Sequence, residues 1–332
     1  MVRGRYAPSP TGALHLGSAR TLVAAWASVR AQGGAFVWRV EDLDGPRTVP
    51  GAVRAQLDDA RWLGLDWDEG PDPATGADVG PHAPYAQSAR SARYDAALAH
   101  LAETGRLFPC RRSRKDLAAL ASAPHGRAAT GAPAAGALPG TDGLPPYPKA
   151  WRPALPLPAG WLVPGLDAAL RFVVPKGVRC FDDRVQGRTC EDTAAAVGDI
   201  VLKRRDGAFA YQLAVVVDDL AMGVTEVVRG ADLLDSTVRQ LHLIDALGGA
   251  PPAYAHLGLV VNAQGEKLSK RDGALALGAL RAAGVAPEAV LGWIAHSLGL
   301  AETAAPLQAR ELAARFDWAK VPPTPVHAAA WA

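Results

Sequence analysis

The first hundred residues of the chain alternate short apolar segments with longer amphipathic ones. Residues 3–7 and 36–40 have the length and composition of strands, whereas residues 14–31 and 50–63 have helical spacing. The first helix would end at a Gly-Gly pair and the second would open at a proline. Because a strand, a helix and a strand in succession form a parallel pair, this order predicts an α/β fold built on a parallel sheet.

Further elements follow on both sides of an irregular stretch. Residues 118–164 are rich in Ala, Pro and Gly and poor in large apolar side chains, which predicts an irregular insertion. A helix beginning near Ser88 and ending at Gly105 precedes it. Strands that return to the sheet are expected at residues 170–174, 199–203, 211–217 and 224–229. Helices are expected at residues 233–247, 275–283, 287–298 and 308–316.

Composition limits the class of protein. The chain has 332 residues, enough for two domains, and no apolar run long enough to cross a bilayer, so no membrane partner is expected. A motif follows Met1 almost directly, so we expect no signal sequence and a cytoplasmic location. The net charge is only +2, which means that a nucleic-acid site would have to be a local basic patch.

The three cysteines, Cys110, Cys180 and Cys190, are odd in number and widely spaced. This pattern argues against a disulfide framework, and it contains no Cys-x-x-Cys pair that could begin a metal site. We therefore expect three buried, unpaired thiols.

The segment from Arg5 to Ser18 reads Arg-Tyr-Ala-Pro-Ser-Pro-Thr-Gly-Ala-Leu-His-Leu-Gly-Ser and joins the first strand to the first helix. Free N–H groups at a helix start favour phosphate, and Gly12 and Gly17 would let a flat ligand approach the backbone. His15 adds a donor that could follow charge developing on an α-phosphate. Taken alone, the segment is also compatible with an ordinary helix start.

A second phosphate site is predicted far downstream. Lys267 and Lys270 lie three residues apart in the segment Gly-Glu-Lys-Leu-Ser-Lys-Arg, where they could meet pyrophosphate oxygens. An isolated run of this kind is most often an exposed loop. The presence of two such segments in one βαβ chain favours a nucleotide site.

Four segments resemble a known family. They are Arg5 to Gly12 with His15-Leu-Gly-Ser18, Arg39-Val-Glu-Asp-Leu-Asp44, Val228-Arg-Gly-Ala-Asp232 and Lys267-Leu-Ser-Lys270. They resemble the glutamyl-tRNA synthetases and, more closely, the glutamyl-Q tRNA(Asp) synthetases, which are shortened paralogues. The resemblance covers approximately residues 3–110 and 166–300.

The resemblance implies a class I synthetase fold: α/β, with a Rossmann-type parallel sheet, an inserted subdomain and a short C-terminal helical region. Residues 1–107 and 196–250 would form the two halves of the Rossmann catalytic domain. Residues 108–195 would form the inserted acceptor or zinc-like subdomain, which contains the low-complexity segment. Residues 251–332 would carry the lysine loop, of the KMSKS type, and a helical region that contacts the tRNA stem.

The resemblance also implies the residues that bind substrates. For glutamate they are Arg5, Tyr6, Ala7, Pro8, Ser9, Glu41, Tyr211 and Arg229. For ATP, which would bring Mg²⁺, they are His15, Gly17, Ser18, Lys267, Ser269 and Lys270, with His15 and Lys270 catalytic. The charges agree, because a zwitterion with an extra carboxylate needs one anion and two cations around it. The alternatives are solvated acids and surface ion pairs for the charged members, and a core position for Tyr211.

The implied reaction is ATP-dependent activation of L-glutamate to glutamyl-adenylate, with transfer to the queuosine at the anticodon wobble position of tRNA(Asp). Two features favour this branch of the family. About sixty residues follow Arg271, too few for a separate anticodon-binding domain, and Val215 stands where charging enzymes usually have asparagine. The expected partner is the anticodon stem-loop of tRNA(Asp), and the protein is expected to be a monomer. Zinc is expected to be absent, because Arg112 replaces a cysteine ligand after Cys110.

Three alternatives remain open. A minimal glutamyl-tRNA synthetase would charge the tRNA 3′ end and would generally activate glutamate only with tRNA present. A small-molecule ligase of the same nucleotidyl-transfer superfamily would not need to keep Arg5, Glu41 and Arg229. A catalytically inactive binding module would be expected to have damaged motifs, and both motifs are intact.

Overall fold

The structure is a computed structural model, and it describes residues 1–122, 145–268 and 275–328. At its centre is a six-stranded sheet in the order β2 (Ala35–Trp38), β1 (Arg3–Tyr6), β10 (Glu226–Gly230), β11 (Ala253–Leu257), β7 (Arg179–Asp183) and β8 (Gly187–Glu191). The first five strands are parallel, and β8 runs antiparallel to β7. The expected α/β fold with a mostly parallel sheet is therefore confirmed.

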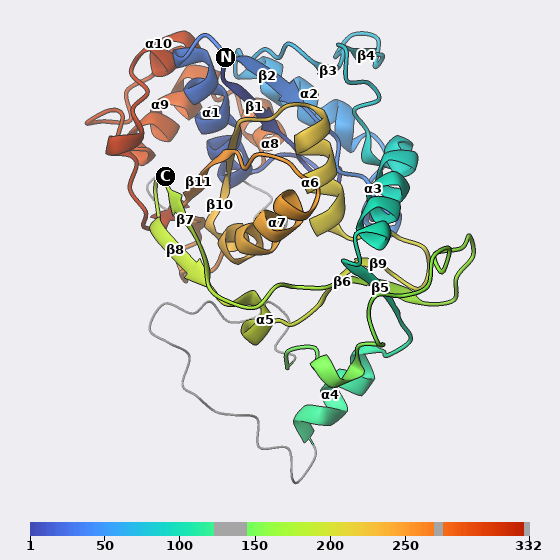
Figure 1. Ribbon diagram of the computed structural model, residues 1–332. Helices are drawn as coiled ribbons and strands as arrows, with labels where there is room; N and C mark the ends of the chain where they lie inside the picture. The colour runs from blue at the N-terminus through green and yellow to red at the C-terminus, as the bar shows by residue number, and fades with distance from the viewer. Residues whose placement is uncertain (123–144, 269–274, 329–332) are drawn as a thin grey trace.

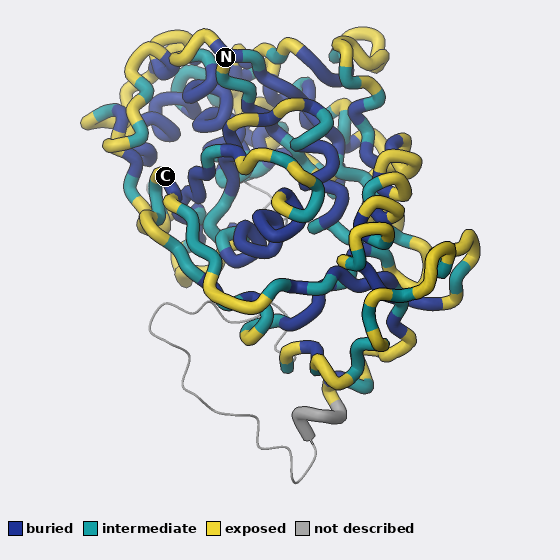
Figure 2. The backbone as a smooth tube through the Cα atoms, in the orientation of Figure 1, coloured by how far each residue is buried: buried dark blue, intermediate teal, exposed yellow. Residues whose placement is uncertain are grey.

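Helices cover both faces of this sheet (Figure 1). Neighbouring residues of a strand point to opposite faces, and in β10 Val227 and Val228 belong to different apolar cores. The core of Val228 includes α1, α9 and α10, and that of Val227 includes α3, α6 and α7. Figure 2 shows α7 buried along its length and α3 exposed on its outer side. The bounds are α1 (Leu16–Ala31), α2 (Ala52–Trp62), α3 (Ser91–Glu103), α4 (Arg114–Ser122), α5 (Thr193–Ala196), α6 (Tyr211–Ala221), α7 (Leu234–Ala246), α8 (Leu277–Ala282), α9 (Pro287–Ser297) and α10 (Ala309–Ala314).

The strand expected at residues 211–217 is wrong, because these residues form the first two turns of α6. Leu213 to Val217 are all buried, and a continuous apolar run is compatible with a buried helix as well as with a buried strand. The helix continues through Asp218 and Asp219 to Ala221. Because side chains repeat every 3.6 residues in a helix and every two in a strand, residues 211–217 contact different neighbours than a strand would.

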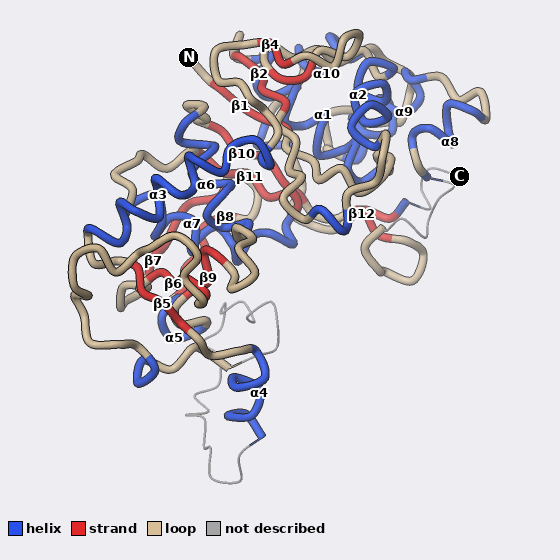
Figure 3. Tube along the Cα trace, turned by 90° about the vertical axis from the view of Figure 1, so that its right-hand side faces the viewer, coloured by secondary structure: helices blue, strands red, loops and turns tan. Residues whose placement is uncertain are grey.

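Two other expected strands are present but belong to a second sheet. β5 (Leu107–Cys110), β6 (Ala169–Phe172) and β9 (Ile200–Lys203) form an antiparallel three-stranded sheet rather than joining the parallel one. In the ribbon of Figure 1 and the tube of Figure 3, this sheet lies below the central one, and α4 extends beyond it. These strands pair together where the chain enters and leaves the insertion, so strand propensity alone does not reveal their partners.

The expected irregular insertion, residues 118–164, is irregular over residues 145–164, whereas residues 118–122 form the end of α4. Residues 145–164 contain one turn of 3-10 helix, Lys149–Trp151, and Tyr147 is buried against Phe108 and Trp151. The remainder of the Ala/Pro/Gly-rich segment, residues 123–144, lies outside the described residues.

Short strand pairs complete the fold. They are β3 (Gly70–Pro71) with β4 (Asp78–Val79), and β12 (Val260–Val261) with β13 (Val326–His327). Over the described ranges, none of the helices has the length and apolarity needed to span a membrane.

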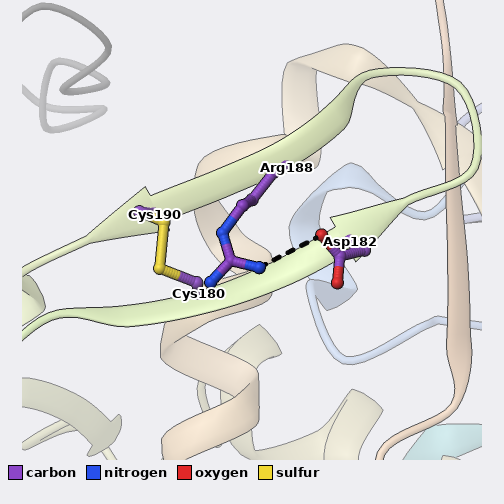
Figure 4. The surroundings of a disulfide bond; sticks show 4 residues. All are labelled: Cys180, Asp182, Arg188 and Cys190. Atoms are coloured by element: carbon purple, nitrogen blue, oxygen red, sulfur yellow. Dashed lines mark ion pairs between the residues drawn. A yellow bond between two sulfur atoms is a disulfide. The ribbon is translucent and has the colours of Figure 1, made fainter.

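The expectation of three unpaired cysteines is wrong for two of them. Cys180 and Cys190 face each other across the β7–β8 hairpin, with Cα atoms 4.1 Å apart, and form a disulfide (Figure 4). Asp182 and Arg188 pair on the same hairpin at 3.6 Å. The spacing of ten residues does not reveal this register, because it depends on where the hairpin turns. Cys110 is buried and unpaired, as expected.

Asp59 provides a test of helix packing. It is buried in α2, and its carboxylate lies 3.6 Å from Arg281 of α8. Burial raises the pKa of Asp59 to about 6 from 3.8, although Arg281 opposes the shift. Since the folded state then holds the proton more tightly, ionisation costs stability as pH rises from about 4 to about 6, up to roughly 3 kcal/mol.

Asp59→Asn should therefore gain free energy of unfolding relative to wild type as pH rises through this range, and the gain should level off above it. Urea unfolding at a series of pH values measures the difference. A difference that does not vary with pH would contradict this account.

Candidate active site

His15 caps the first helix at the end of the loop that follows β1. Its Nδ1 accepts the backbone N–H groups of Gly17 at 3.1 Å and Ser18 at 3.2 Å. Ser18 Oγ in turn accepts the His15 backbone N–H at 2.8 Å. The expectation of free amides at this helix start is therefore wrong for Gly17 and Ser18, because the histidine ring satisfies both.

This cap fixes the tautomer of His15. Because Nδ1 accepts hydrogen bonds, the neutral ring carries its hydrogen on Nε2. A donor at Nε2 has the chemistry that a developing phosphate charge requires. Gly12, earlier in the same loop, has φ of 138°, a backbone region that favours glycine.

A cavity of about 570 Å³ opens at the carboxyl ends of β1 and β10. β1 has β2 on one side and β10 on the other, so the strand order reverses there, and α/β proteins bind ligands at such a point. Every described residue that was predicted to bind substrate lines this cavity. They are Arg5, Tyr6, Ala7, Pro8, Ser9, Glu41, Tyr211 and Arg229 for glutamate, and His15, Gly17, Ser18 and Lys267 for ATP. Ser269 and Lys270 lie outside the described residues.

Four charged side chains form a buried network beside the cavity. Arg39 donates to Asp219 at 2.6 Å and to Glu41 at 3.0 Å. Arg5 pairs with the same Asp219 at 3.5 Å. The Arg39 side chain is fully buried, so its charge depends on these partners. These contacts fix the side chains of Arg5 and Glu41 at the wall of the cavity.

The pKa values of the two carboxylates of this network shift in opposite directions. Burial raises the pKa of Glu41 above its ordinary value, in spite of Arg39 and Arg5. Burial also acts to raise the pKa of Asp219, but the attraction of Arg39 and Arg5 outweighs it and lowers that pKa. Asp219 is thus a stable anion that balances two arginines. Glu41 is the carboxylate that would gain most from an added cation, such as a substrate ammonium.

Arg39 and Asp219 were missed as site residues from the sequence. The strand expected at residues 211–217 would have ended before Asp219, whereas α6 carries it back toward Arg39. One signal was present: two adjacent acids interrupt an otherwise apolar run, and buried acids usually have cationic partners.

Arg229 reaches the cavity from β10. Its Nε–H donates to His256 Nε2 at 2.9 Å, and its Nη2 donates to Thr237 Oγ1 at 2.8 Å. Its Nη1 donates to the hydroxyl oxygen of Tyr211 at 3.4 Å, and Tyr211 lines the cavity while it also packs against the apolar core of α6 and α7. His256 and Thr237 belong to no recognisable motif, so only the fold brings them to Arg229.

Lys267 forms an ion pair with Asp232 at the cavity wall, and both side chains are partly exposed. The pair joins two of the segments that carry the family resemblance. Phosphate oxygens would compete with Asp232 for the Lys267 ammonium, since both are anionic acceptors.

Among the residues that the structure describes, no group of three or more His, Cys, Asp or Glu side chains is placed to hold a metal ion. The sulfur of Cys110 lies 3.2 Å from the hydroxyl of Tyr147.

Asp219→Asn should destabilise the folded protein, because Arg39 would remain buried with weaker partners. We expect a loss of about 3 kcal/mol in the free energy of unfolding, as for other broken buried pairs. Asp58→Asn is the matched control, since Asp58 pairs with Arg54 on an exposed face and should change stability by less than about 1 kcal/mol. Equal losses for the two variants in urea unfolding would argue against the network.

Comparison with known proteins places this site in a family. Residues 1–131 and 163–322 match the family of class I tRNA synthetases (E and Q), catalytic domain. The glutamyl-Q tRNA(Asp) synthetase of Symbiobacterium thermophilum is 46% identical over 327 residues, 98% of this chain and 95% of that protein. The glutamyl-Q tRNA(Asp) synthetase of Nitratidesulfovibrio vulgaris is 43% identical, with the same coverage.

A solved structure agrees in fold. The crystal structure of a glutamate tRNA ligase from Elizabethkingia meningosepticum, in complex with its amino acid, has a TM-score of 0.81 and 28% sequence identity. The match covers 98% of this chain and 66% of that one. With these matches along nearly its whole length, the chain belongs to the class I glutamyl- and glutaminyl-tRNA synthetase family, and within it to the glutamyl-Q tRNA(Asp) synthetases.

Proposed function

We propose that this protein activates L-glutamate with ATP to form glutamyl-adenylate and transfers the glutamyl group to queuosine in the anticodon of tRNA(Asp). The observation that carries the proposal is a single cavity in which the carboxylate of Glu41 lies together with Arg5 and Arg229, while Asp232 of the same lining is paired with Lys267. This set of charges complements glutamate, which has one ammonium and two carboxylates. The similarity to glutamyl-Q tRNA(Asp) synthetases over nearly the whole chain supports the choice of acceptor.

Four polar groups of the cavity have roles in the proposed first step. Glu41 binds the substrate ammonium, and Arg229 binds a substrate carboxylate through its planar fork. The carboxylate that reacts forms a bond to the α-phosphorus of ATP while the bond to the pyrophosphate oxygen breaks. The Nε2–H of His15 donates to the oxygen that gains charge, and Lys267 stabilises the departing pyrophosphate. The step requires positioning and charge neutralisation, and no protein nucleophile.

Mg²⁺ would enter this site with the ATP phosphates. Lys270 and Ser269, from the lysine segment, complete the ATP site in the proposal. We also expect the protein to act as a monomer in the cytoplasm, where its tRNA substrate is found.

A second cavity supports docking of an RNA substrate. It measures about 680 Å³ and lies beside the start of α6, where Tyr211 lines the first cavity and Gln212 the second. Among the described residues that line it, the only acid is Asp199, and the arginines are Arg112, Arg114, Arg171, Arg204, Arg205 and Arg239. Arginine contacts to phosphate supply affinity for RNA that does not depend on its sequence.

The activation step should not need tRNA. We expect glutamate-dependent exchange of pyrophosphate into ATP without tRNA, and attachment of labelled glutamate only to queuosine-containing tRNA(Asp). Transcribed tRNA(Asp) that lacks queuosine is the control. Exchange that strictly requires tRNA, or labelling of the 3′ end, would favour a tRNA-charging enzyme instead.

The arginine-lined cavity should contribute to transfer of glutamate to the tRNA and not to adenylate formation. The double variant Arg112→Gln, Arg114→Gln should weaken tRNA binding about tenfold and reduce its dependence on salt, since each phosphate contact contributes about one unit of slope. Pyrophosphate exchange should be unchanged. The control is Arg54→Gln, Arg61→Gln on α2, which removes two exposed arginines elsewhere. Equal loss of tRNA binding in both double variants would contradict a role for this cavity.

A further inference from the structure

Three neighbouring strands bring together Asp183, His256 and Arg229. In the register of the parallel sheet, Arg229 of β10 is the direct partner of His256 of β11. Asp183 of β7 pairs with Tyr254, two residues before His256. All three side chains lie in the interior, with 5%, 0% and 5% of the Asp183, His256 and Arg229 surfaces exposed. Asp183 lies at the β7–β8 hairpin, His256 lies between the other two, and Arg229 lies at the cavity.

The hydrogen bonds among these residues allow only one arrangement of protons. A guanidinium has donors and no acceptor, so the nitrogen that faces Arg229, His256 Nε2, must accept. The ring is then neutral and carries its hydrogen on Nδ1, which donates to Asp183 Oδ2 at 2.6 Å. Asp183 also accepts the backbone N–H of His256 at 3.1 Å, which fixes the carboxylate relative to the ring.

The charge states agree with this arrangement. Burial lowers the pKa of His256, and Arg229 lowers it further, which keeps the ring neutral in spite of Asp183. Burial acts to raise the pKa of Asp183, but the contacts with His256 and the backbone hydrogen bond from Gln186 together outweigh it and lower that pKa, so the carboxylate stays ionised.

These contacts use part of the Arg229 guanidinium and leave the rest for a ligand. Of its five N–H donors, Nε–H is directed to His256 and one Nη2–H to Thr237. One Nη1–H donates to the hydroxyl oxygen of Tyr211 at 3.4 Å, which leaves the second hydrogens of Nη1 and Nη2 for a ligand at the cavity that Arg229 lines. Two adjacent donors of this kind match the two oxygens of a carboxylate.

We propose that Asp183 and His256 are positioning residues for substrate binding. Asp183 fixes the His256 tautomer, and His256 holds Arg229 in the orientation that pairs with a substrate carboxylate. The inference rests on the proposed function only in taking glutamate as that substrate. It assigns a function to the β7–β8 hairpin, whose last β7 residue would control a side chain two strands away.

The first experiment replaces the carboxylate by its amide. Asp183→Asn can turn its NH₂ group toward His256 Nδ1, which would move the ring hydrogen to Nε2 and set it against the Arg229 Nε–H. We expect the KM for glutamate in pyrophosphate exchange to rise about tenfold or more, with the KM for ATP within about twofold of wild type. Asp182→Asn is the matched control, because Asp182 is the preceding residue of β7 and is exposed.

A second set of variants tests the histidine. In His256→Gln the amide oxygen can still accept from Arg229, so the rise in KM for glutamate should be smaller than in His256→Leu. His242→Gln is the control, since His242 is a buried histidine of α7 outside the active-site cavity. Thermal unfolding of each variant checks the fold, and His256→Gln carries the test if Asp183→Asn or His256→Leu is unfolded.

The dependence on pH provides a readout that a purely structural role would not affect. The charged and titratable groups around His256 are Asp183 of β7, Arg229 of β10, Arg5 of β1 and Tyr254 of its own strand. As pH falls below about 6.5, the ordinary pKa of histidine, protonation of His256 would remove its acceptor and raise the wild-type KM for glutamate. His256→Gln has no such proton to gain, so its KM should rise less over the same range.

Different results would overturn the positioning role and the proposed function. Unchanged KM values for glutamate in Asp183→Asn and His256→Gln, or equal rises for glutamate and ATP, would overturn the positioning role. A wild-type protein without glutamate-dependent exchange would overturn the proposed function instead. In that case, isothermal titration with glutamate alone tests the positioning pair, and equal affinity in wild type and His256→Gln would overturn it as well.

Discussion

The parallel pairing of β1 with β10 is the interaction on which the cavity depends. Gly4 of the first strand aligns with Glu226 of a strand that follows the whole insertion. The pairing sets Arg5 against the backbone of β10, where its Nη1 donates to the carbonyl oxygen of Val228 at 3.3 Å. Glycine at position 4 is required for the packing behind it, because an added Cβ would lie 2.4 Å from Val29 Cγ2 of α1.

A second constraint is the balance of buried charge between α6 and the residues of the chain that precede the insertion. Asp218 of α6 has no exposed surface, and it accepts hydrogen bonds from Arg90 at 2.6 Å and from Tyr94 and Gln87 at 2.8 Å. Its neighbour Asp219 balances the arginines of the cavity. Asp218 and Asp219, two adjacent acids on one helix, therefore bind α6 to side chains from the N-terminal part of the chain. A buried network of this kind is costly to disturb, because each partner that is lost leaves a charge without compensation.

The sequence identified residues that line one cavity more accurately than it placed the elements around them. Local patterns identified the parallel sheet and the residues of the cavity from β1, the start of α1 and β10, because these lie in motifs with fixed spacing. The run at Leu213–Val217 was assigned to a strand because a buried helix and a buried strand have the same apolar composition. The Cys180–Cys190 pair and the contacts of Arg229 with His256 depend on the register between strands, which no local pattern encodes.

In the proposed function, one cavity between β1 and β10 binds glutamate and the nucleotide together. The most direct measurement is a crystal structure of the protein with a non-hydrolysable glutamyl-adenylate analogue. The account predicts the ammonium of the analogue beside Glu41, its side-chain carboxylate on the open side of the Arg229 guanidinium, and its phosphate mimic near His15. An analogue bound outside this cavity, or bound within it with no contact to Glu41 or Arg229, would contradict the account.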